Sequence, residues 1–97
     1  MIAHVVMLKF KLDRDEAVQE IKQRLDMLPA MIPEIVYYEV GLNELGSDRA
    51  FDLVLYSKFA SYDDLKTYNN HPEHVSVLQL IGQHVEKAHS VDYTLPE

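Results

Sequence analysis

The chain has 97 residues, of which 16 are acidic and 9 basic, and its formal net charge is −7. This charge repels phosphate backbones and anionic lipid surfaces, so we expect neither a nucleic acid partner nor a membrane role. The absence of cysteine excludes disulfides, thiolate nucleophiles and cysteine-based metal sites. A hydrophobic fraction of 47% predicts one globular domain over residues 1–97. The chain opens directly into strand-like sequence without a charged leader, so we expect a cytoplasmic protein.

The first half of the chain predicts a strand, a helix and a second strand. Residues 2–11 are β-branched and nearly continuously apolar, which is typical of a strand covered on part of both faces. Asp13 and Glu16 have the spacing of a capping box, and apolar residues then recur at helical spacing as far as Pro29. Residues 35–42 favour a strand that ends at Gly41 and a polar stretch.

The second half predicts a third strand over residues 51–59, close enough to the second to form a hairpin. Ser61 and Asp64 predict the start of a short helix. A longer helix is expected from Pro72 to about Lys87, followed by a closing strand over residues 89–94. The order of elements is the α+β, ferredoxin-like βαββαβ pattern, with a four-stranded antiparallel sheet.

Helices on one side of such a sheet leave its other face open. Here both faces of the strands are largely apolar, and an open apolar face of this size indicates a partner surface. Closed two-fold homodimers are the commonest oligomers. We therefore predict a homodimer in which two sheets face each other.

The segment from Tyr68 to His74, with the sequence YNNHPEH, is the candidate site. Proline suits the first turn of a helix, and the residue before it is pushed out of the α region. One helix should therefore end near Asn69 or Asn70 and another begin at Pro72, with His71 in the joint. In the first turn of the new helix, the positive end of the helix dipole favours a neutral ring at His74.

An ordered set of short blocks extends over nearly the whole chain: HVVMLKFK from His4, Ile32-Pro33, Glu39-Val40-Gly41, FDLVL from Phe51, Tyr68 with HPEH, and Val91-Asp92-Tyr93. With these blocks the chain resembles the stress-responsive dimeric α/β barrel (Dabb) family. The resemblance implies a ferredoxin-like monomer that forms a dimeric α/β barrel. It implies no single activity, because one fold hosts many functions.

The family includes a plant polyketide cyclase that works without a cofactor, and the resemblance to it implies roles for five residues. His74 would be the base, Tyr68 the residue that orients the base or the substrate, and His4 a third catalytic residue lining the pocket. His71, in the joint, and Leu53, on the strand where the cyclase has a further histidine, would contact the ligand. This chain has no substitute for that third-strand histidine.

Three functions remain open on the sequence. The first is binding of a small organic ligand near Tyr68 and His74, and the second is a cofactor-free cyclase or isomerase with His74 as base. A neutral histidine and a phenol supply the acceptor and the donor that deprotonation beside a carbonyl requires. The third is a stress-associated dimer without a ligand. We expect no cofactor and no metal site, since the proline break turns His71 away from a continuous helical face.

Overall fold

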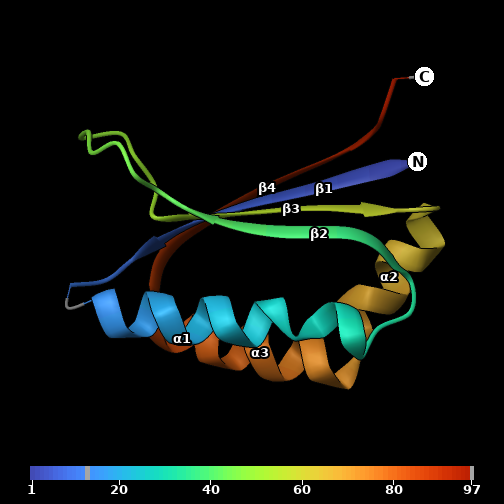
Figure 1. Ribbon diagram of the computed structural model, residues 1–97, viewed down its shortest axis with the longest axis horizontal. Helices are drawn as coiled ribbons and strands as arrows, with labels where there is room; N and C mark the ends of the chain where they lie inside the picture. Colours follow the sequence, from blue (N-terminus) through green and yellow to red (C-terminus); the bar gives the residue numbers. More distant parts are fainter. Residues whose placement is uncertain (13, 97) are drawn as a thin grey trace.

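The computed structural model describes residues 1–12 and 14–96, so the expected capping residue Asp13 lies outside the described part. The elements follow in the order β1 (Ile2–Phe10), α1 (Arg14–Asp26), a 3₁₀ turn (Leu28–Ala30), β2 (Ile35–Leu42), β3 (Leu53–Phe59), α2 (Tyr62–Asn70), α3 (Pro72–His84) and β4 (Val85–Thr94). Figure 1 shows the helices on one side of the sheet and the other side uncovered. The ferredoxin-like architecture is thereby confirmed.

The sheet has the strand order β2-β3-β1-β4 and is antiparallel throughout. The hairpin expected between the second and third strands is present. β1 lies in the interior of the sheet and pairs with both β3 and β4. Its near-continuous apolar sequence suits this position, because a central strand is covered on both edges and packed on at least one face.

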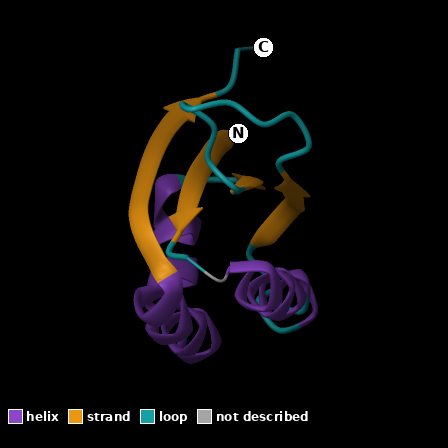
Figure 2. Cartoon of the chain, turned by 90° about the vertical axis from the view of Figure 1, so that its left-hand side faces the viewer, coloured by secondary structure: helices purple, strands orange, loops and turns teal. Residues whose placement is uncertain are grey.

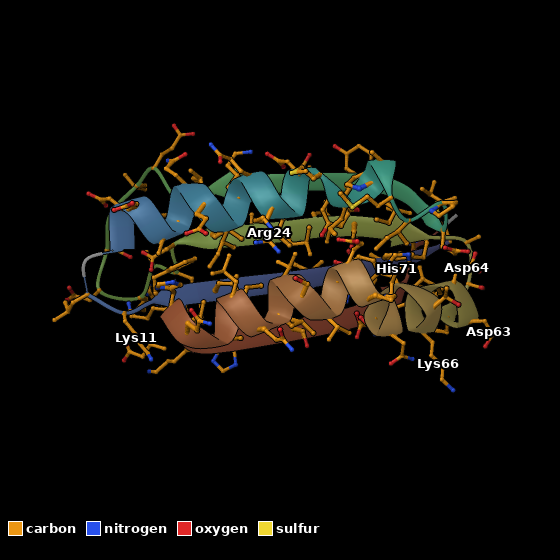
Figure 3. All side chains as sticks on the ribbon, turned by 90° about the horizontal axis from the view of Figure 1, so that it is seen from below. Lys11, Arg24, Asp63, Asp64, Lys66 and His71 are labelled. Carbon is orange, nitrogen blue, oxygen red and sulfur yellow. The ribbon has the colours of Figure 1, made fainter. Side chains whose placement is uncertain are left out.

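The core lies between the sheet and the helices. Ile21 and Leu25 on α1, and Val77 on α3, are almost fully buried, as are Phe10 and Phe59 on the sheet. Figure 3 shows α1 and α3 side by side beneath the sheet. The Nη2 atom of Arg24 on α1 donates a hydrogen bond to the hydroxyl of Ser76 on α3, at 3.1 Å.

The boundary between the last helix and the last strand differs from the sequence expectation. α3 ends at His84 rather than near Lys87, and β4 begins at Val85 without an intervening loop, as Figure 2 shows. Val85 pairs with Phe10 next to a register shift in β1. This β-branched residue, which the sequence analysis placed in the helix, therefore belongs to β4.

The open face of the sheet carries an exposed apolar surface. Its members alternate with the inward residues along the strands and include Met7, Tyr37, Val91 and Tyr93, all more than 40% exposed. The ammonium group of Lys58 lies over the ring of Tyr37 at 5.2 Å. Large exposed apolar patches of this kind mark interaction surfaces.

The expected break between α2 and α3 is confirmed. Ser61 caps α2 by accepting a hydrogen bond from the backbone N–H of Asp64, and α2 ends at Asn70. His71 has extended backbone angles (φ −64°, ψ 135°), and Pro72 then begins α3. Within the described residues, no helix is both long and apolar enough to span a bilayer.

Candidate functional site

A cavity of about 280 Å³ lies between the inner face of the sheet and α3. Apolar side chains from β1, β3, β4, α1 and α3 form most of its wall. The polar groups at one end include His4 on β1, His74 on α3 and Asn69 on α2. A mostly apolar pocket with a few convergent polar groups is the usual form of a small-molecule site.

His74 is held in one tautomer by the end of α2. Its Nδ1 atom lies 3.0 Å from the carbonyl oxygen of Asn69, one of the last carbonyls of that helix and so without an intrahelical N–H partner. A carbonyl can only accept, so Nδ1 carries the proton and, in the neutral ring, Nε2 carries the lone pair. Among the described residues, Nε2 has no hydrogen-bond partner.

Burial lowers the pKa of His74 below its ordinary value of 6.5, and the nearby imidazoles of His4 and His71 lower it further. The hydrogen bond to Asn69 opposes this shift in pKa but is the smaller effect. The lowered pKa favours the neutral ring expected from the sequence, and its largest cause is desolvation.

His4 is paired with a residue at the far end of the chain. Its Nδ1 atom contacts the carboxylate of Asp92 on β4, because the antiparallel register places the two residues opposite each other. A carboxylate on one ring nitrogen fixes the tautomer and directs the other nitrogen elsewhere. His4 is 9% exposed and lines the cavity, so its Nε2 atom is the nitrogen left for a ligand.

Tyr68 lines the same cavity as His74 and His4, but its hydroxyl group is paired with another tyrosine. Its side chain is 0% exposed, and its hydroxyl lies 2.8 Å from the hydroxyl of Tyr38 on β2. Burial raises the pKa of Tyr68 to about 12. The ring packs against His74, with centroids 4.3 Å apart, and against His4 at 6.1 Å. Tyr68 therefore packs against both imidazoles, and its hydroxyl group is already hydrogen-bonded to that of Tyr38.

His71 and Leu53 are not brought into this cavity. The ring of His71 accepts a hydrogen bond at Nδ1 from the backbone N–H of Glu73, at 3.1 Å, and so caps α3; Figure 3 shows it at the junction of the helices. Leu53 is buried in the core, opposite Leu8. Neither residue lines the cavity beside His74, because the proline break turns His71 into the cap and strand alternation directs Leu53 into the packed interior. Their contact with a ligand stays a prediction.

Sequence reasoning missed two residues of the site, Asp92 and Tyr38. Asp92 follows from His4 once β1 and β4 are paired, but the pairing register is a tertiary property. Tyr37 and Tyr38 are neighbours on β2 and point to opposite faces of the sheet. Which of them points inward depends on a bulge in the pairing of β2 with β3. Within residues 1–12 and 14–96, no three histidine or carboxylate side chains gather as metal ligands.

The fold and the cavity define a small α+β domain with two buried imidazoles beneath an open sheet. The family description "Stress responsive A/B Barrel Domain" (Dabb) matches residues 2–95. The chain belongs to this family.

Similar proteins share the domain and the fold. The chain is 32% identical, over 81% of its length, to a stress-response A/B barrel domain-containing protein of Arabidopsis thaliana, of whose length it spans 30%. A dimeric ferredoxin-like protein of unknown function from Bacteroides fragilis is 32% identical, with a TM-score of 0.88 over 97% of this chain and 95% of that one. The hydroxynitrile lyase of Passiflora edulis is 22% identical, with a TM-score of 0.86 over 99% and 94%, a likeness in fold alone.

The lowered pKa of His74 predicts a pH dependence of stability. Above about pH 6.5 the ring is neutral in both the folded and the unfolded chain. As the pH falls below that value, the unfolded chain binds the proton first, so the free energy of unfolding decreases. Urea unfolding at pH 7.5 and 5.5 should show a larger decrease in the wild type than in His74→Gln. Equal decreases, or an NMR spectrum with the proton of neutral His74 on Nε2, would contradict the assignment.

Proposed function

We propose that the cavity binds a small organic molecule that donates a hydrogen bond to Nε2 of His74. The observation that carries this proposal is the fixed tautomer: the Asn69 carbonyl occupies Nδ1, which leaves an acceptor nitrogen at the wall of an otherwise apolar cavity. A ligand hydroxyl would satisfy that nitrogen, and its carbon skeleton would be covered by apolar side chains.

The presence of the cavity also favours ligand binding over a purely structural role. A domain that served only as a dimer scaffold would gain stability from filling this space, because voids in a core are unfavourable. His4 and Asp92 further support a ligand. His4 places an imidazole at the cavity wall and is paired with Asp92, whereas apolar side chains of the same size would need no polar partner there.

A hydroxyl group on the ligand should therefore increase affinity. We expect the wild type to bind 4-ethylphenol about 2- to 10-fold more tightly than 4-ethylanisole, the usual range for one net hydrogen bond. His74→Phe should remove this difference. His71→Asn, which keeps a capping side chain outside the cavity, should retain it. NMR titration measures both affinities. If the wild type binds neither compound, the binding function is rejected in favour of a purely structural role.

A second candidate function is proton abstraction beside a carbonyl, with His74 as the base. It is favoured by the combination of a neutral His74 with a free Nε2 atom and a second imidazole, His4, oriented by a carboxylate. The base would take the proton at Nε2, and His4 would donate from its own Nε2 to the developing enolate oxygen while both of its ring nitrogens carry protons, with the carboxylate of Asp92 balancing the charge. A general base and a hydrogen-bond donor on the same wall are the minimum that such a reaction requires.

This reaction is tested by deuterium exchange at the α carbon of 2-heptanone in D₂O, followed by NMR. If His74 is the base, His74→Ala should lower the exchange rate by roughly 10²- to 10⁴-fold. His84→Gln, at the end of α3 and outside the cavity lining, serves as the histidine control and should leave the rate unchanged. No exchange above the buffer rate in the wild type would reject catalysis on ketones without affecting the binding function.

We further propose that two copies of the chain pair through their open sheet faces. The exposed apolar residues on that face support a partner, and fold relatives from three sources are described as dimeric. The same face on both copies gives a two-fold interface. A permanent interface of this kind buries on the order of 2,000 Å² or more.

A charge on the open face should weaken this dimer. Met7 on β1 is 42% exposed and Val75 on α3 is 40% exposed, so they form a matched pair on opposite sides of the molecule. Sedimentation at micromolar concentration should give a dimer for the wild type and for Val75→Asp, and a larger monomer fraction for Met7→Asp. A monomeric wild type, or equal dissociation of both variants, would reject the sheet-face interface.

A further inference from the structure

The cavity changes from polar to apolar along β1. The inward residues His4, Val6 and Leu8 line it in turn. The register of β4 sets Asp92 opposite His4, Ser90 opposite Val6 and Ala88 opposite Leu8. Inward residues two apart on a strand are separated by about 7 Å. The wall therefore has three successive layers, with His4 in the first, Val6 and Ser90 in the second, and Leu8 and Ala88 in the third; His89, between Ala88 and Ser90 on β4, also contributes to the lining.

α3 follows the same gradient on the other side of the cavity. His74, Leu78 and Ile81 line the wall in this order, and seven helical residues span about 10 Å. The two elements therefore agree in direction: the imidazoles lie together at the joint between α2 and α3, and the aliphatic side chains lie toward the end of α3.

The cavity is closed at its apolar end and open along one side. The next inward residue on β1, Phe10, is 1% exposed and does not line the cavity, so the space ends at the layer of Leu8. On the open side, Leu78 is 46% exposed, and Ala88 and Ser90 on β4 are also exposed. A ligand can thus enter between α3 and β4 and lie along β1.

We propose, on the basis of the binding function above, that the ligand is an elongated amphipathic molecule whose hydroxyl head lies at His74 and whose unbranched apolar tail extends along β1, and that Ala88 limits the length of the tail. Ala88 has the smallest side chain of the last layer, where it is paired with Leu8 and lines the same cavity as Ile81. A larger side chain at this position would fill the end of the cavity without touching the imidazoles.

The test uses primary alcohols from 1-butanol to 1-nonanol as probes, with affinities measured by NMR titration of the full chain. For the wild type, affinity should rise about fourfold per added methylene and then stop rising when the tail reaches Phe10. In Ala88→Phe the rise should stop at a shorter chain. The longest alcohol that still gains affinity in the wild type should lose about tenfold or more, and 1-butanol should change less than about twofold.

The control variant is Val75→Phe, which places the same ring on an exposed position of α3 that does not line the cavity. It should leave the whole series unchanged. If the wild type binds 4-ethylphenol but its affinity for alcohols does not depend on chain length, or if Ala88→Phe weakens short and long alcohols equally, the amphipathic alignment is wrong while the binding function stands. If the wild type binds neither the phenol nor any alcohol, the binding function itself fails.

Discussion

The pairing of the first strand with the last is the constraint on which the site depends. β1 lies inside the sheet, and its register with β4 places Asp92 beside His4 although 88 positions separate them in the chain. Because side chains alternate with a period of two, a slip of one residue would turn His4 and the other inward side chains to the opposite face. The polar end and the apolar end of the cavity both follow from this one register.

The break between α2 and α3 supplies the second half of the site. A continuous helix would have satisfied the carbonyl of Asn69 with a backbone N–H, whereas the break at His71 and Pro72 leaves that carbonyl to accept from His74. The same hydrogen bond completes the end of a helix and selects a tautomer. A local rule of helix termination thereby determines which nitrogen of His74 is basic.

Tyr68 is buried and Tyr38 is half-buried, and together they form the surroundings of the His74 ring. The hydroxyls of Tyr38 and Tyr68 satisfy each other, and burial raises the pKa of both phenols. With its ring against His74, Tyr68 excludes water from one side of that imidazole. The environment of the His74 ring thus depends on a residue that itself has no exposed surface.

The sequence by itself determined the order of the elements and the break at Pro72, because proline, capping and alternation act over a few residues. The resemblance to the family, also evident in the sequence, indicated His4 and His74 as candidate site residues. Only the tertiary structure decided that Asp92 faces His4, that Tyr68 lies behind the imidazoles, and that His71 caps a helix while Leu53 packs in the core. The tertiary structure also showed that β4 begins at Val85 rather than at residue 89. These outcomes depend on strand register and burial, and both are set by contacts between residues far apart in the chain.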